Sequence, residues 1–190
     1  MKLLITGSRG QVGRALCALA LEQGIEFQAF SSDELDIRKE SRVLRSIKKA
    51  KPAFVVNAAA YTEVDKAEHD EEACFAVNVA GVQNLANACK RLNIPLIHLS
   101  TDYVFNGEQR APYVEDDEPC PINLYGKSKL EGERQLRSLL EHYVVLRVSW
   151  VFSEWGNNFV KTMTRLAGER EKLSVVDDQL GAPTPAADIA

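Results

Sequence analysis

Tyr125 and Lys129 are the two residues of this sequence whose types and spacing most directly suggest chemistry. They are four residues apart in a stretch with helical spacing, so both side chains fall on one face of the predicted helix. A phenol with its usual pKa of about 10 exchanges protons poorly at neutral pH, and a nearby ammonium stabilises the phenolate. We therefore predict that Lys129 lowers the pKa of Tyr125 and that the pair acts in proton transfer.

A hydroxyl residue follows the fourth apolar run of the chain. Leu96–Ser100 is typical of a buried strand, and Thr101 and Asp102 come directly after it. Ligands of open α/β folds bind at the carboxyl ends of the strands, although a threonine there also commonly ends a strand or caps a helix. Together with the Tyr125 pair, the position favours a catalytic Thr101 that hydrogen-bonds a substrate carbonyl.

A glycine-rich turn comes directly after the first apolar run. Gly7, Gly10 and Gly13 stand three residues apart between Leu3–Thr6 and an amphipathic stretch. Glycines there allow a tight turn and a close approach to a pyrophosphate, which the helix N-terminus then faces. The alternative is a βα turn without a ligand, and the position of the turn favours dinucleotide binding.

The second strand bears on which dinucleotide is bound. Asp36 and Ile37 follow it, and Asp36 is expected either to contact the adenosine or to cap the next helix. Ser31 and Ser32 stand where NAD-binding proteins often carry an acid. Arg9 in the turn is suited to a 2′-phosphate, or is simply solvated. We expect NADPH as the cofactor, with NADH as the alternative.

The chain alternates between short β-rich runs and longer stretches of helical spacing, which predicts an α/β fold. The predicted strands are Leu3–Thr6, Phe27–Phe30, Phe54–Asn57, Leu96–Ser100 and Val144–Arg147. The predicted helices are Val12–Gln23, Val43–Lys49, Ala73–Arg91, Leu124–Leu140 and Phe159–Glu169. We expect a Rossmann-type, doubly wound parallel sheet covered on both faces. Residues 1–150 would form the dinucleotide-binding domain, and residues 151–190 an incomplete start of a substrate-binding region.

Composition excludes several classes of protein. The 190 residues are 45% hydrophobic, which is ample for one buried core. A net charge of −4 and a pI near 5.5 argue against nucleic acid as a partner. No apolar run is long enough for a membrane span or followed by a leader cleavage site, so we expect a cytoplasmic protein. The scattered cysteines and histidines indicate no protein-built metal site.

These motifs together resemble the extended short-chain dehydrogenase/reductase family, which combines the glycine turn, a hydroxyl after the fourth strand and the tyrosine–lysine pair. Further similar blocks are Val56–Glu68, Ser100–Phe105, Tyr125–Glu133, Arg147–Phe152 and Gly156–Met163. The resemblance implies NAD(P)H-dependent reduction of the C4 carbonyl of a dTDP-linked keto sugar, in nucleotide-sugar and polysaccharide biosynthesis. It implies cofactor contacts at Gly7, Gly10, Gln11, Val12, Gly13, Asp36, Ile37, Ala60, Tyr61, Thr62, Tyr125 and Lys129. It implies sugar-nucleotide contacts at Thr101, Asp102 and Trp150.

Several alternatives stay open within this resemblance. Nucleotide-sugar dehydratases carry an Asp-Glu pair after the threonine, whereas this chain has Asp102-Tyr103, which makes a dehydratase less plausible. An epimerase, another ketone reductase, and a non-catalytic regulator similar to the β subunit of methionine adenosyltransferase remain as alternatives. Some relatives are described as magnesium-dependent, and no ligands for magnesium are assigned. Members normally continue past this endpoint, so we expect a fragment, and a homodimer is a further expectation.

Overall fold

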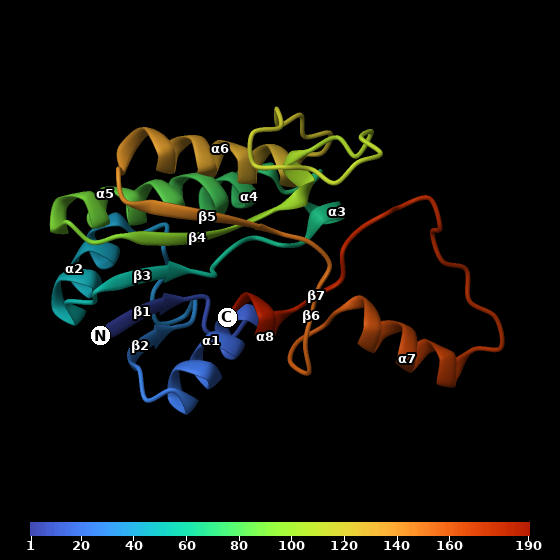
Figure 1. Ribbon diagram of the computed structural model, residues 1–190, viewed down its shortest axis with the longest axis horizontal. Helices are drawn as coiled ribbons and strands as arrows, with labels where there is room; N and C mark the ends of the chain where they lie inside the picture. The colour runs from blue at the N-terminus through green and yellow to red at the C-terminus, as the bar shows by residue number, and fades with distance from the viewer.

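Five parallel strands form the centre of the structure, a computed structural model that describes residues 1–190 (Figure 1). The strands are β1 (Lys2–Thr6), β2 (Glu26–Phe30), β3 (Phe54–Asn57), β4 (Leu96–Thr101) and β5 (Tyr143–Val148). Their order across the sheet is β2-β1-β3-β4-β5, so the chain winds outward first to one side of β1 and then to the other. The predicted parallel α/β sheet is confirmed, and every strand points its carboxyl end to the same edge.

Three helices pack against one another on one face of this sheet. They are α2 (Glu40–Ala50), α5 (Val82–Leu92) and α6 (Leu124–Leu139). The main core lies beneath them and includes the fully buried side chains of Leu4, Ile47, Val55, Leu85, Leu96 and Leu136. Each such side chain contributes roughly 1.5–3 kcal/mol when it leaves water, so this layer fixes the sheet and the helices that carry the site.

The opposite face of the sheet is covered only in part. Helix α1 (Gln11–Glu22) packs there against β1 and β2. At the other end of the sheet, Val144 and Leu146 on the edge strand β5 are 49% and 38% exposed. The expectation that both faces are covered is therefore wrong for β5, because α1 reaches only the β1–β2 end of this face.

The predicted helix Ala73–Arg91 is divided into three parts. Helix α4 (Glu71–Phe75) runs into a π-helical turn at Ala76–Gly81, which continues as α5. The carbonyl of Asn78 in that turn faces α6 so closely that a Cβ at Gly132 would lie 2.2 Å from its oxygen. The wider turn thus sits where two helices touch through their backbones, and a glycine permits the contact.

Residues after β5 form small elements that the sequence did not predict, apart from α7 (Phe159–Glu169). Strands β6 (Val151–Phe152) and β7 (Thr184–Pro185) pair in parallel, and helix α8 (Ala186–Ile189) packs on α1. Two further short helical segments are α3 (Val64–Ala67) and a 3-10 turn at Asp102–Val104. No helix combines the length and the apolar composition that a membrane crossing requires.

Candidate functional site

The turn between β1 and α1 has the geometry of an anion-binding site. Gly7 has φ of 70°, and a Cβ there would lie 2.4 Å from the carbonyl oxygen of Ala58. A Cβ at Gly13 would lie 2.2 Å from the carbonyl oxygen of Gly7. Helix α1 begins after Gly10 with no side-chain cap and no acid in its first turn. Its first N–H groups therefore keep their capacity for a phosphate, and these residues fit a pyrophosphate.

Gln11 joins this turn to the segment after β5. Its Oε1 accepts hydrogen bonds from Ser153 Oγ at 3.0 Å and from Asn158 Nδ2 at 2.9 Å. Its Nε2 donates to the carbonyl of Val151 at 3.3 Å. The side chain is committed to these protein partners, so the main-chain N–H groups of Gln11 and Val12 are left to face a ligand.

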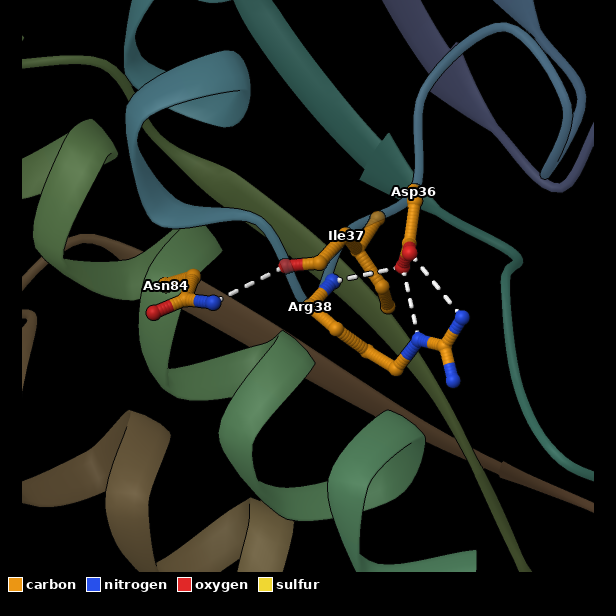
Figure 2. A network of polar contacts seen from close by, with 4 residues as sticks. All are labelled: Asp36, Ile37, Arg38 and Asn84. Carbon is orange, nitrogen blue, oxygen red and sulfur yellow. Dashed lines mark hydrogen bonds and ion pairs between the residues drawn. The ribbon is translucent and has the colours of Figure 1, made fainter. Parts of the chain in front are cut away.

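The loop after β2 holds Asp36 and Ile37 in two different ways, as Figure 2 shows. The Asp36 carboxylate accepts from the Arg38 backbone N–H at 3.0 Å and from Nε and Nη2 of Arg38 at 2.8 and 2.9 Å. The hydrogen bonds from Arg38 lower the pKa of Asp36. Ile37 is buried, and its carbonyl accepts from Asn84 Nδ2 at 3.0 Å. The Ile37 side chain therefore belongs to the main core of the protein.

The interpretation of Asp36 as a cap of the next helix is wrong. Helix α2 begins at Glu40 after Lys39, and that N-cap makes no side-chain hydrogen bond. Asp36 instead bonds to a residue two positions along, which is the usual local pattern for an Asp in a turn. Its remaining expected role is the contact with the adenosine of a cofactor.

Ala60, Tyr61 and Thr62 follow β3, and Asn78 of the π-helical turn fixes their backbone. The Tyr61 N–H donates to Asn78 Oδ1 at 2.9 Å, and Asn78 Nδ2 donates to the Tyr61 carbonyl at 3.1 Å. The Tyr61 hydroxyl donates to Asp70 at 3.2 Å. Ala60 remains partly exposed and Thr62 exposed, so this clamped segment presents accessible groups beside the glycine turn.

Thr101 and Asp102 lie at the carboxyl end of β4. Thr101 Oγ1 donates to Asp102 Oδ1 at 3.1 Å and accepts from the Tyr103 N–H at 3.2 Å. The second bond caps the short 3-10 turn, so the capping alternative for Thr101 is also correct. Burial raises the pKa of Asp102, while the bond from Thr101 acts in the opposite direction. To donate to a substrate carbonyl, the Thr101 hydroxyl must turn away from Asp102.

Tyr125 and Lys129 occupy the first two turns of α6, which begins after Asn123. The Asn123 side chain caps the helix by accepting from the Gly126 N–H at 2.7 Å. Both predicted residues are buried, and Lys129 Nζ donates to the Leu99 carbonyl at 2.7 Å. Helix α6 thus brings both side chains against the carboxyl half of β4.

The protonation of this pair differs from the prediction. Burial raises the pKa of Tyr125 to about 12, and a hydrogen bond with Thr101 only partly offsets the increase. Burial also lowers the pKa of Lys129 to about 8, against the opposing effect of Glu133. The expected lowering of the Tyr125 pKa is therefore wrong in this structure, because loss of water around the phenol raises that pKa.

Trp150 follows β5 in a left-handed backbone conformation with φ of 46°. Its carbonyl accepts from the Thr184 N–H at 3.3 Å. A Cβ at Gly181 would lie 2.4 Å from the indole ring, so the 181–184 segment rests against Trp150. Trp150 as a whole remains exposed.

A chain of buried polar groups, which the spacing of the sequence motifs does not reveal, lies behind the site. Thr6 Oγ1 donates to Asn57 Oδ1 at 2.6 Å, and Asn57 Nδ2 lies 2.9 Å from Nδ1 of His98. His98 Nε2 is buried without a partner, and burial holds the pKa of His98 well below its usual value. Asn57 and His98 are register partners on β3 and β4, so polar residues within two buried strands were a usable signal.

The structure brings all of the predicted site residues to the carboxyl edge of the sheet. They end or follow one of the strands β1 to β5, or lie at the start of α6. No group of three His, Cys, Asp or Glu side chains comes together to hold a metal ion. This arrangement of an uncapped helix N-terminus, a strand-end hydroxyl and a Tyr–Lys pair defines a Rossmann-type nucleotide-binding protein of the short-chain dehydrogenase/reductase class.

Comparison with known proteins narrows this class. The chain belongs to the family described as RmlD substrate binding domain, whose profile matches residues 1–190. It is 50% identical over 190 residues to dTDP-4-dehydrorhamnose reductase of Aggregatibacter actinomycetemcomitans, covering 100% of this chain and 65% of the relative. It is 42% identical over 191 residues to the enzyme of that name from Escherichia coli K12, covering 98% of this chain and 63% of the relative.

Solved structures agree with the family assignment. The dTDP-4-dehydrorhamnose reductase of Bacillus anthracis, in complex with NADP, has a TM-score of 0.96 and 40% identity, covering 99% of this chain and 67% of that chain. UDP-glucose 4-epimerase of Brucella ovis shares the fold with a TM-score of 0.83 and 24% identity, covering 99% of this chain and 70% of that chain. The chain thus spans just under two thirds of the length of the curated relatives above.

Proposed function

We propose that this chain is part of an NADPH-dependent reductase that converts dTDP-4-dehydro-L-rhamnose to dTDP-L-rhamnose for polysaccharide biosynthesis, with NADH as the alternative donor. The observation that carries the proposal is the position of Tyr125 and Lys129 beside Thr101, all buried at the edge where α1 presents its uncapped N-terminus. The identity of 50% to a protein named dTDP-4-dehydrorhamnose reductase supports the choice of sugar.

The cofactor would be held by the residues around the glycine turn. In the proposal, the N–H groups of Gln11, Val12 and Gly13 bind the pyrophosphate, while Asp36 and the Ile37 backbone contact the adenosine. The clamped segment Ala60–Thr62 would lie along the cofactor towards Tyr125. When bound, the reduced nicotinamide supplies the hydride for the C4 carbon of the sugar.

Tyr125 is proposed as the proton donor. A pKa of about 12 keeps the phenol protonated at neutral pH, yet it is a stronger acid than the alkoxide that forms when a ketone is reduced. Proton transfer from Tyr125 to that oxygen therefore runs downhill. The Thr101 hydroxyl, turned from Asp102, would orient the same oxygen.

Lys129 is proposed to hold the cofactor ribose and to stabilise the Tyr125 phenolate once the proton has left. A pKa of about 8 leaves its ammonium charged at neutral pH. Because the side chain is buried, its charge acts with little screening by water. Asp102 and Trp150 would contact the nucleotide sugar.

The test is NADPH oxidation at 340 nm by the full-length protein supplied with dTDP-4-dehydro-L-rhamnose. We expect Tyr125→Phe to lower kcat by about 10²- to 10⁴-fold, because the proton donor is removed, and to leave the Kd for NADPH within about twofold. Tyr103→Phe is the matched control, since its ring packs edge-on against Tyr125 at 5.7 Å. Unchanged turnover by Tyr125→Phe would refute its role.

The same assay separates the alternatives. An epimerase would convert the sugar without net oxidation of NADPH, whereas a reductase oxidises one NADPH for each sugar reduced. A regulator similar to the β subunit of methionine adenosyltransferase would bind NADPH, turn over no sugar and change the activity of a partner enzyme. If the protein reduces only a different nucleotide-sugar ketone, the proposed mechanism stands and the proposed substrate is wrong.

The proposal extends to the organisation of the protein. Residues 1–150 would be the dinucleotide-binding domain, and residues 151–190 the start of the substrate-binding region, whose Ser153 and Asn158 already bond to Gln11. We propose a cytoplasmic enzyme acting on a nucleotide sugar. A homodimer is also proposed, which light scattering of the purified protein measures directly.

A further inference from the structure

Two arginine–carboxylate pairs flank the place where the adenosine ribose of the proposed cofactor would lie. The first, Arg38 with Asp36, is local and bidentate (Figure 2). The second joins Arg9 in the glycine turn to Asp33 in the loop after β2 through a single Nη1–Oδ2 contact. The Ser8 N–H donates to the Phe30 carbonyl at 3.0 Å, so the turn and the loop are also held together by their backbones.

The two pairs differ in how firmly each arginine is held. Three hydrogen bonds fix the Asp36 carboxylate to Arg38. The side chains of Arg9 and Asp33 are 67% and 71% exposed, and they meet in one contact only. An exposed single-contact pair is worth little, so a stronger anion can displace Asp33. The Arg9 guanidinium can therefore exchange Asp33 for another anion, whereas the Arg38 guanidinium stays bonded to Asp36.

NADPH carries such an anion at this position, and NADH does not. The 2′-phosphate is a monoester with a charge of about −1.5 to −2 at pH 7, and a guanidinium binds it in a fork of N–H donors. NADH has a neutral 2′-hydroxyl in place of the phosphate, so it brings no charge that competes for the guanidinium. NADPH is thus the cofactor whose 2′ group can compete with Asp33 for the Arg9 guanidinium.

We propose that Asp33 is a specificity-determining residue that competes with the 2′-phosphate of NADPH for Arg9 and so keeps both cofactors usable. This inference deepens the proposed function and rests on it for the cofactor. With NADPH, Arg9 leaves Asp33 for the phosphate. With NADH, which has no 2′-phosphate, the Arg9–Asp33 pair stays closed.

Glu34, the neighbouring acid, is not available for the same role. Its carboxylate accepts from the backbone N–H and the hydroxyl of Ser31, both at 2.8 Å. Arg42 Nη2 reaches only the Glu34 carbonyl, at 3.4 Å. Among the acids of this loop, Asp33 is the one whose carboxylate is bonded to the arginine of the glycine turn.

The experiment measures Kd for NADPH and for NADH by fluorescence titration of the full-length protein without sugar. The readout is the ratio of Kd for NADH to Kd for NADPH. Asp33→Asn should raise this ratio roughly fivefold, the upper range for an exposed ion pair, and the gain should shrink as salt increases. Arg9→Gln should lower the ratio. In the double variant, the effect of Asp33→Asn should disappear, because Asp33 acts through Arg9.

Glu26→Gln is the matched control. Glu26 pairs with Lys2 at 3.0 Å, also between β1 and β2, but at the amino edge of the sheet. It should leave the ratio unchanged. Both Asp33 and Glu26 are exposed, so thermal unfolding should show that both variants are folded.

The outcomes separate this inference from the proposed function. A wild type that binds both cofactors, with a ratio that Asp33→Asn leaves within twofold, overturns the inference alone. An effect of Asp33→Asn that persists in the Arg9→Gln background also overturns it, since simple repulsion would then suffice. A wild type that binds neither cofactor overturns both. The expected ratio shifts, lost in the double variant and absent in Glu26→Gln, establish Asp33 in this role.

Discussion

The two ends of the candidate site differ in how far their side chains are buried. At the reacting end, Tyr125, Lys129 and Thr101 are buried, and burial sets the pKa values of Tyr125 and Lys129. At the adenosine end, Arg9 and Asp33 are largely exposed and meet in a single ion pair. The proposed chemistry thus rests on buried groups, and the proposed cofactor choice rests on exposed groups that can exchange partners at little cost in free energy.

The residues that hold helix α6 in place at the reacting end are also largely buried. The Glu133 carboxylate of α6 accepts from Ser100 Oγ and forms a bidentate pair with Arg147 of β5, at 3.1 and 2.7 Å. Arg147 also lies over the Phe105 ring, 5.0 Å from its centroid. This cluster ties α6, and with it Tyr125 and Lys129, to β4 and β5.

The largest effect is expected when the positive charge of Lys129 is removed from the buried end of the site. We expect Lys129→Ala to lower kcat by about 10²- to 10⁴-fold and to weaken NADPH binding as well. The reason is that the same ammonium is proposed to hold the cofactor ribose and to stabilise the Tyr125 phenolate. Lys129→Met, which keeps most of the volume, should behave similarly. Lys127→Ala, an exposed lysine on the same helix, is the control. Wild-type affinity and turnover in Lys129→Ala would end its assignment.

The second test compares two ion pairs of equal length. The contacts Arg147–Glu133 and Arg165–Glu169 both measure 2.7 Å, with side-chain exposures of 18% and 3% against 60% and 52%. Arg147→Leu should cost about 3–5 kcal/mol of the free energy of unfolding, because it leaves a buried carboxylate unpaired. Arg165→Leu should cost under about 1 kcal/mol. Denaturant titration measures both, and equal losses would contradict the assigned role of burial.

The smallest effect is a pH dependence at the buried end. The Lys129 ammonium, with a pKa of about 8, loses its proton as pH rises through that value. The kcat/KM should therefore be level below pH 8 and fall up to about tenfold per pH unit above it. Tyr125, with a pKa of about 12, does not titrate in this range. A profile that stays level to pH 9.5, with the fold intact by circular dichroism, would contradict this pKa.

The sequence predicted the parts of the fold that follow from periodicity. Each predicted strand agrees with β1 to β5 to within one or two residues, since runs such as Leu96–Ser100 are short, apolar and bounded. The break in the predicted helix Ala73–Arg91 could not be seen this way. It accompanies the close contact of the Asn78 carbonyl with Gly132, more than fifty residues away, which no local pattern encodes.

The candidate site, like the fold, could be predicted from the sequence only in part. Residue types and spacing placed Tyr125, Lys129 and Thr101 at one edge of the sheet, because strand ends in a parallel sheet share that edge. The direction of the Tyr125 pKa shift was wrong, since the degree of burial is a property of the packed structure. The pairing of Asp36 with Arg38 was missed because side-chain partners depend on the conformation of the loop.

The contact between Trp150 and Gly181 gives the protein an optical property. The chain has two tryptophans, and Trp150 is 43% exposed, with the 181–184 segment lying against its indole. Any event that moves this segment changes the water around the ring and hence the wavelength of its emission. Substituting Trp155 with Phe leaves Trp150 as the only tryptophan among residues 1–190, so selective excitation of its indole reports the position of the 181–184 segment without a label or a substrate.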